Sequence, residues 1–408
     1  RREVWLMGRK SEEELEEIKK KYGVDHLWSW SKFNTYHNSP YEYYLKYIKH
    51  IPEDRQDCIY TTTGGMAHTI MEDLYTGKIQ YEDMDSDFED AWMTAGIADL
   101  KFDRNDSEKN KRISDKYYKN LKHFFNNHFK MPYKLQIEQF ITVLIGKNVF
   151  QGYIDACYKD KEGNYTILDW KTSSIYKGEK ALNECGQLVV YAIGLHQMGI
   201  PFEKIKICWD FLKYVKVDCK QANGKWTTRD IERSEVGSKL QTSVKMWLKK
   251  CGYEDCLMEY LDLLTMTNNI NVLPQDVRDN FIFHDCIVYV DLTQELINKW
   301  TTNIVNTIDE IENKERRYSE TQDEKIFYDS LEQVKAQSYY FSTLCAYSPN
   351  RHKPYKLYLD ELENKKNGAS LFGDVGSNTD DLKRSTANID IKSSKNEEQE
   401  DLSWLDLL

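Results

Sequence analysis

The sequence lacks any apolar run that approaches the roughly 20 residues needed to cross a lipid bilayer, so we expect no membrane span. It also has no C-x-x-C pair among its nine cysteines, whose irregular spacing excludes a zinc knuckle and a disulfide framework. The charged start Arg1-Arg2-Glu3 does not open a signal peptide. We therefore expect reduced thiols in a cytoplasmic protein.

An excess of basic residues is missing too. The net charge of −11 argues against a protein that coats nucleic acid through bulk electrostatics, but not against an active site built from carboxylates. Part of the acidic excess lies in residues 361–408, where eleven acids face six bases. The chain of 408 residues, with 40% hydrophobic and 13% aromatic residues, can form one large domain with insertions, or two domains. Its richness in Lys, Asn, Ile and Tyr hints at an AT-rich genome, such as that of a phage.

The stretch Gly152 to Thr172 is the most informative part of the sequence. Two runs of β-forming residues, 151–158 and 165–172, flank a polar segment, 160–164, that has the composition of a turn. We predict an antiparallel hairpin. If its turn is centred on Glu162, Asp155 lies directly opposite Asp169.

Asp169 and Lys171 then share one face of their strand, because side chains alternate along a strand. Two carboxylates and an ammonium at one place are costly unless a cation or a phosphate uses them. A solvated hairpin with ordinary surface charges is the alternative. The neighbouring residues argue against this alternative, because they are apolar and indicate a sheet packed on both sides. They are Ile154, Ala156, Ile167, Leu168 and Trp170.

Two predicted helices carry further candidates. The helix predicted over 61–75, ended by Gly77, places His68 and Glu72 on one face after a Gly64-Gly65 pair that permits close approach. His68 is either a site residue or a structural histidine. The amphipathic helix predicted over 179–198 places Glu184, Gln187, Tyr191 and Gly194 on one stripe.

The remaining elements are predicted from periodicity and capping residues. A strand over 135–145 leads into the hairpin, and its Glu138 either faces the same site or forms a salt bridge. Ser31 and Pro40 are expected to start two short helices rich in aromatic core residues. The other predicted elements are helices over 11–22, 83–127, 239–277 and 293–315, strands over 204–213 and 287–292, and a hairpin turn at Gly224.

Periodicity disappears near residue 361, and the tail 361–408 is predicted to be disordered. Its last residues, Glu397 to Leu408, place apolar anchors in an acidic field, as in peptides that fold onto a partner. The cluster Ala369 to Phe372 slightly resembles a sliding-clamp motif without its leading Gln. An inert solubilising tail is the alternative for both segments.

The ordered series of His68, Asp155, Asp169-Trp170-Lys171, Gln187 and Tyr191 resembles the PD-(D/E)XK nuclease superfamily. More narrowly, it is similar to the branch of RecB-type exonuclease domains and CRISPR adaptation nucleases. The matching motifs are G-x-x-x-H ending at His68, G-x-x-D ending at Asp155, D-x-K-T from Asp169 and Q-x-x-x-Y from Gln187. Together they cover about residues 28–215.

The resemblance implies that Asp155 and Asp169 hold Mg²⁺ or Mn²⁺, with His68 and the Trp170 carbonyl completing the ligands. It implies that Lys171 orients or deprotonates the attacking water, and that Gln187 and Tyr191 contact the nucleic-acid backbone. Many relatives also carry four cysteines for an iron–sulfur cluster. Here only Cys58 and Cys345 echo them and Asn38 replaces a cysteine, so no cluster is expected. A Walker A motif is absent as well, so any helicase motor must come from another protein.

The implied fold is α/β, with a restriction-endonuclease-like core (a mixed central sheet flanked by helices), helical insertions and a disordered tail. The predicted division is an N-terminal helical segment 1–60, a nuclease core 61–215, a helical and strand extension 216–360 and the acidic tail 361–408. The implied function is a metal-dependent DNA exonuclease in replication, recombination or repair.

Two alternatives remain open. One is a nuclease-fold scaffold that docks through its tail onto a sliding clamp, a helicase or another replication or transcription component. The other is an RNA-directed or structure-specific endonuclease on the same fold.

Overall fold

The structure is a computed structural model that describes residues 10–55, 59–97 and 106–371. The chain forms two compact units. Of the described residues, unit 1 comprises 10–18, 59–97, 106–143 and 152–298, and unit 2 comprises 19–55, 144–151 and 299–371. The four-part division predicted from the sequence stays a prediction.

A six-stranded mixed sheet forms the centre of unit 1, apart from residues 144–151, which contain the turn between its first two strands and the adjoining strand ends and are counted with unit 2. The order is β1-β2-β3-β4-β5, with β6 also paired to β4. The pair β3–β4 is parallel, whereas β2–β3, β4–β5 and β4–β6 are antiparallel. This confirms the predicted mixed sheet. The strands are β1 (Gln136–Ile145), β2 (Asn148–Lys159), β3 (Tyr165–Lys171), β4 (Ile205–Lys220), β5 (Trp226–Glu232) and β6 (Phe281–Val290).

The crossover between the parallel strands β3 and β4 contains two helices, α7 (Glu179–Glu184) and α8 (Gly186–Gln197). The helical character predicted over 179–198 is confirmed, but the prediction of one continuous amphipathic helix is wrong, because a turn at Cys185 divides it into two helices. Helix α8 is buried on nearly every side against β3 and β4. A Cβ at Gly194 would lie 2.5 Å from the Ile141 side chain, so a larger residue would force its neighbours on β1 to shift.

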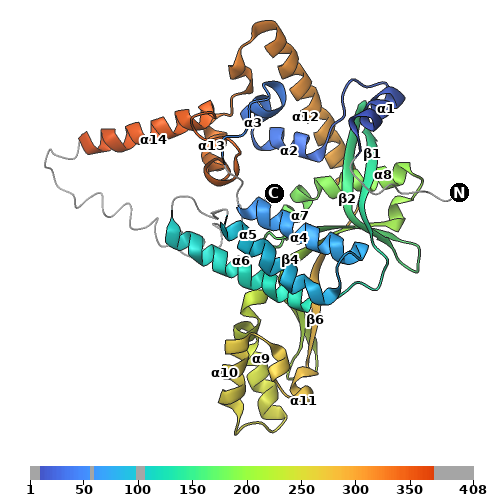
Figure 1. The fold of residues 1–408 in the computed structure, drawn as a ribbon, viewed down its shortest axis with the longest axis vertical. Helices are drawn as coiled ribbons and strands as arrows, with labels where there is room; N and C mark the ends of the chain where they lie inside the picture. The colour runs from blue at the N-terminus through green and yellow to red at the C-terminus, as the bar shows by residue number, and fades with distance from the viewer. Residues whose placement is uncertain (1–9, 56–58, 98–105, 372–408) are drawn as a thin grey trace. The chain divides into compact units, whose positions relative to one another are not determined.

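Helices α4 (Ile59–Thr76), α5 (Met84–Ile97) and α6 (Ser107–Asn127) pack side by side in unit 1 (Figure 1). Gly77, with φ of +78°, ends α4 as predicted. Among them, α4 contacts β3 directly, which brings a helical face to the hairpin that carries the acidic residues.

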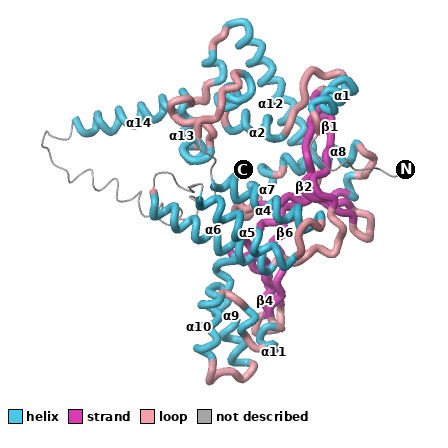
Figure 2. The backbone as a smooth tube through the Cα atoms, viewed as in Figure 1, coloured by secondary structure: helices cyan, strands magenta, loops and turns pink. Residues whose placement is uncertain are grey.

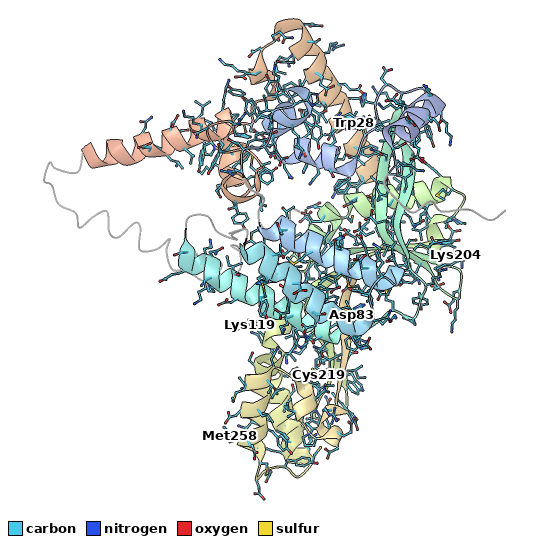
Figure 3. The ribbon with its side chains drawn as sticks, viewed as in Figure 1. Trp28, Asp83, Lys119, Lys204, Cys219 and Met258 are labelled. Carbon is cyan, nitrogen blue, oxygen red and sulfur yellow. The ribbon has the colours of Figure 1, made fainter. Side chains whose placement is uncertain are left out.

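The distal half of β4 continues with β5 and β6 into an extension of unit 1 (Figure 2). One face of this ribbon packs on α9 (Val236–Lys250), α10 (Leu257–Thr267) and α11 (Gln275–Arg278). Cys219 is fully buried in their shared core, whereas Met258 on α10 is 63% exposed (Figure 3). The extension thus has an apolar core of its own. Its three helices confirm the predicted helical character of most of 239–277.

Unit 2 is mainly helical in its described residues, apart from the strand residues within 144–151. Ser29, not Ser31, caps its first helix by accepting a hydrogen bond from the Lys32 backbone, and Ser39 caps the next, which Pro40 begins. Its helices are α2 (Trp30–Asn38), α3 (Pro40–Tyr43), most of α12 (Gln294–Thr321), α13 (Leu331–Ala336) and α14 (Lys353–Leu371), and α1 (Glu12–Tyr22) spans the unit boundary.

Helix α14 corrects the prediction for the tail, because residues 361–371 are helical. The peptide from Glu397 to Leu408, Phe372 and Cys58 lie outside the described residues. The eight cysteines that the structure describes are reduced thiols. Within the described ranges, every helix is too short or too polar to cross a membrane.

Candidate active site

Strands β2 and β3 bring two aspartates to facing positions. Ala156 pairs with Leu168 and Cys157 with Ile167. This is the predicted register, and one residue further along it sets Asp155 opposite Asp169. Asp169 is 5% exposed, and the Asp155 side chain is 19% exposed. Both carboxyl groups are therefore held in a largely desolvated position.

Helix α4 adds an imidazole to the two acids. The Nε2 of His68 lies 2.7 Å from the carbonyl oxygen of Trp170, and Nδ1 lies 3.5 Å from the Asp155 Oδ2. Because a carbonyl oxygen only accepts hydrogen bonds, Nε2 carries the hydrogen in this arrangement. One possible ligand atom from each of His68, Asp155 and Asp169 lies within 4.8 Å of the others.

Lys171 completes the cluster from the end of β3. Its Nζ lies 2.8 Å from the Asp169 Oδ2, and its side chain is 18% exposed. Burial alone would lower the pKa of Lys171, but the charge and hydrogen bond of Asp169 and the charge of Asp155 raise it above its ordinary value. The lysine is therefore a cation at neutral pH.

The electrostatics of the cluster fit a bound cation. Burial, followed by the charge of Asp169, raises the pKa of Asp155 well above its ordinary value. Burial lowers the pKa of His68, which keeps the imidazole neutral and able to bind a metal. Two carboxylates, a neutral imidazole and the Trp170 carbonyl form a donor set suited to Mg²⁺ or Mn²⁺.

A family model for the PD-(D/E)XK nuclease superfamily matches residues 27–347. The chain belongs to this superfamily. No curated protein matches the chain. Membership makes the chain a nuclease, and nucleases of this superfamily use divalent metal ions. The mixed sheet with its flanking helices is the restriction-endonuclease-like core of that superfamily.

The structure also brings Tyr191 against Gly152, which precedes Asp155 by three residues, and places Gln187 beside Tyr191. Both lie on α8, and the Gln187 Nε2 donates to the Tyr191 hydroxyl over 3.1 Å. Burial raises the pKa of Tyr191, the hydrogen bond from Gln187 lowers it, and the charges of Asp155 and Asp169 raise it. Glu184 is separated from this pair by the break at Cys185.

Two glutamates flank the nuclease site and were only weakly indicated by the sequence. Glu72 lies one helical turn after His68, and Glu138 lies on β1. Glu138 has φ of +51°, a strained conformation for a residue with a side chain. The pKa of Glu72 is raised to about 7 by burial and by the charge of Glu138 and a hydrogen bond with it. The i, i+4 spacing from His68 was the available signal for Glu72, but nothing in the sequence marks the backbone of Glu138.

Proposed function

We propose that this nuclease is a Mg²⁺- or Mn²⁺-dependent deoxyribonuclease, and specifically a RecB-type exonuclease of DNA replication, recombination or repair. We further propose that a phage encodes it and that it acts in the host cytoplasm. The observation that carries the proposal is the cluster of His68, Asp155 and Asp169 within 4.8 Å, with Lys171 against Asp169. The order of the four sequence motifs supports the RecB-type branch.

In this proposal, His68, Asp155, Asp169 and the Trp170 carbonyl hold the metal ion. When bound, the ion would lower the pKa of a water molecule and stabilise negative charge on the scissile phosphate. The protein holds the Asp155 and Asp169 carboxyl groups next to each other, and a bound cation would offset the cost of their burial and mutual repulsion.

Lys171 orients the attacking water and offsets charge on the phosphate as the water oxygen bonds to phosphorus and the P–O bond of the leaving strand breaks. Its raised pKa favours this role over that of a general base, because a base must first lose its proton. Asp169 supports the lysine through the 2.8 Å ion pair.

Gln187 and Tyr191 are proposed to contact the nucleic-acid backbone beside the metal. Their mutual hydrogen bond fixes the direction of the tyrosine hydroxyl, and the buried helix α8 holds both side chains in place. A polar pair of this kind can donate hydrogen bonds to phosphate oxygens without reading sequence.

The decisive experiment is hydrolysis of linear DNA by the full chain in Mg²⁺ or Mn²⁺, compared with the same protein in a chelator. Asp169→Ala and Lys171→Ala should each abolish the reaction while circular dichroism shows a folded protein. Lys161→Ala and Glu162→Ala, in the exposed hairpin turn, serve as matched controls and should retain it. Full activity in the Asp169 or Lys171 variant would refute the site.

The substrate class is determined by comparing several nucleic acids in parallel assays. End-labelled single-stranded and double-stranded DNA, a covalently closed circle and RNA should be offered in parallel. An exonuclease releases mononucleotides or short products from labelled ends and leaves the closed circle intact. Cleavage of the circle would favour an endonuclease, and a preference for RNA would contradict the proposed deoxyribonuclease.

The C-terminal peptide from Glu397 to Leu408 is proposed to bind a protein partner, such as a sliding clamp, a helicase or another replication or transcription component. Its sequence supports this, because apolar residues around Trp404 stand among acids, as in peptides that fold into a partner's groove. Deleting the peptide should preserve hydrolysis of naked DNA and weaken binding to a purified clamp. Equal clamp binding with and without the peptide would dispose of the clamp as the partner.

A further inference from the structure

The ring of Trp170 contacts two aromatic side chains of α4. His68 meets it edge-on, with ring centroids 5.9 Å apart, and Tyr75 lies nearly parallel to it at 6.2 Å. His68 and Tyr75 are seven residues apart and therefore share a face of the helix. Trp170 is 1% exposed, and its carbonyl oxygen meets His68. One tryptophan thus sets the position of α4 against β3 at both contacts.

The hydroxyl of Tyr75 is held by directed hydrogen bonds. It lies 2.7 Å from the Nε2 of His128 and accepts from the Met131 backbone N–H over 3.1 Å. The Nδ1 of His128 lies 2.8 Å from the Asp285 Oδ2. Because a carboxylate only accepts, Nδ1 carries the hydrogen, and Nε2 accepts from the tyrosine when the imidazole is neutral.

Asp285 is itself anchored. It accepts hydrogen bonds from the Phe129 backbone over 3.1 Å and from the Nη2 of the fully buried Arg233 over 2.5 Å. Burial alone would raise the pKa of Asp285, but the hydrogen bond from His128 and the charge of Arg233 lower it. The carboxylate is therefore ionised. The series of hydrogen bonds from Arg233 through Asp285 and His128 to Tyr75 links β6 and the end of α6 to α4, the helix that carries His68.

We propose that Tyr75 is a positioning residue of the metal site, held by the buried Tyr75–His128–Asp285 chain and acting through the ring of Trp170 on the Trp170 carbonyl and His68. The inference rests on the proposed function. Without the tyrosine hydroxyl, His128 loses its hydrogen-bond partner at Nε2 and the ring is no longer tied in place. The Trp170 carbonyl and His68 then spend more time away from the geometry that a cation needs.

The test is a calorimetric titration of the full chain with Mn²⁺, together with the Mn²⁺ dependence of DNA hydrolysis. Tyr75→Phe should weaken Mn²⁺ binding on the order of tenfold, as is typical when a group supporting a metal ligand is removed. Hydrolysis should approach the wild-type rate at saturating Mn²⁺, because the ligands and Lys171 remain. A general loss of stability would lower the maximal rate instead.

Tyr81→Phe is the matched control. The Tyr81 hydroxyl also donates to His128, over 2.7 Å, but to its backbone carbonyl and not to its ring. This variant should bind Mn²⁺ like the wild type. His128→Gln interrupts the Tyr75–His128–Asp285 hydrogen-bond chain at its middle residue and should weaken Mn²⁺ binding as much as Tyr75→Phe does. The double variant should bind Mn²⁺ only slightly more weakly than either single variant, because the two residues act together.

The proposal is overturned if Tyr75→Phe binds Mn²⁺ as tightly as the wild type, or if Tyr81→Phe weakens binding equally. Additive losses in the double variant would also overturn it. A wild-type chain that hydrolyses DNA and binds Mn²⁺ while Tyr75→Phe is unaffected leaves the proposed function standing. A wild-type chain that binds no Mn²⁺ overturns the proposed function and this inference with it.

Discussion

Tyr191 packs so closely against Gly152 that a Cβ added to the glycine would lie 2.8 Å from the tyrosine oxygen. Tyr191 is 7% exposed, and its hydroxyl accepts from Gln187. The tyrosine therefore has little room to move away. The glycine that precedes Asp155 by three residues is thus required by packing, which gives a physical reason for the G-x-x-D spacing.

Gly152→Ala should push the Tyr191 ring aside and break its hydrogen bond with Gln187. Overpacking of this kind costs about 1–3 kcal/mol of unfolding free energy, which urea denaturation measures, and DNA hydrolysis should fall with it. Gly96→Ala in α5 is the control, because its Cβ would meet nothing within 4 Å. An alanine there should stabilise the helix by up to about 1 kcal/mol. Equal stabilities of the two variants would show that the contact with Tyr191 is harmless.

Metal affinity should depend on pH through Asp155. Its pKa is raised by burial and by Asp169, so the carboxyl group must release a proton before it binds a cation. Mn²⁺ affinity should therefore rise with pH, by up to about tenfold per pH unit for one released proton. The pKa of His68 is lowered, so the imidazole is already neutral at neutral pH and adds no further step there.

Calorimetry at several pH values, in two buffers of different ionisation enthalpy, counts the released protons. An affinity that does not change with pH would mean that Asp155 is ionised before the metal binds.

The hairpin and its two acids were predictable because their causes are local. A polar turn fixes the register, and the alternation of side chains then fixes which residues share a face. The structure confirms that register through the pairs Ala156–Leu168 and Cys157–Ile167. The position of His68 was indicated by a motif spacing and not by physics, because the docking of α4 on β3 depends on contacts more than a hundred residues apart.

Other features depend on partners that are distant in the chain. The hydrogen bond between His128 and Asp285 joins residues 157 positions apart, and neither has a local signal. Periodicity also does not reveal that the helical segment is interrupted at Cys185, or that α8 is buried on nearly every side. The sequence also did not distinguish Ser29, the actual helix cap, from Ser31, because the two residues offer the same capping chemistry.

Asp210→Asn should stabilise the protein. Asp210 is fully buried on β4, and among the described residues neither of its carboxyl oxygens has a hydrogen-bond partner. Burial, followed by the charge of Asp285, raises its pKa well above the ordinary value. The native state thus keeps a proton that the unfolded chain releases above about pH 4. Wild-type stability falls as pH rises from there, and asparagine removes that loss.

The gain should be about 1–3 kcal/mol near pH 7 and smaller near pH 4.5, as measured by urea unfolding. Asp218→Asn is the control on the same strand, because Asp218 is hydrogen-bonded to Thr228 and His284 and its pKa is lowered. That variant should gain no stability. An Asp210→Asn protein no more stable than the wild type at pH 7 would mean that the carboxyl group has a partner in solution.

Glu138→Gln should lower the pKa of Glu72, which is raised to about 7 by burial first and by the charge of Glu138 next. A raised carboxyl pKa costs stability as pH rises from the unfolded value, about 4.3, to the folded value. The wild type should therefore lose stability between about pH 4.5 and pH 7, and the variant should lose less over that window.

Carbon NMR of the Glu72 carboxyl group measures the pKa directly. Asp73→Asn is the control and should shift this pKa less, because the charge of Asp73 acts on Glu72 more weakly than that of Glu138. A Glu72 pKa that stays near 7 in the Gln variant would leave burial and the charge of Asp73 as the causes of the shift and remove Glu138 from the electrostatics of the site.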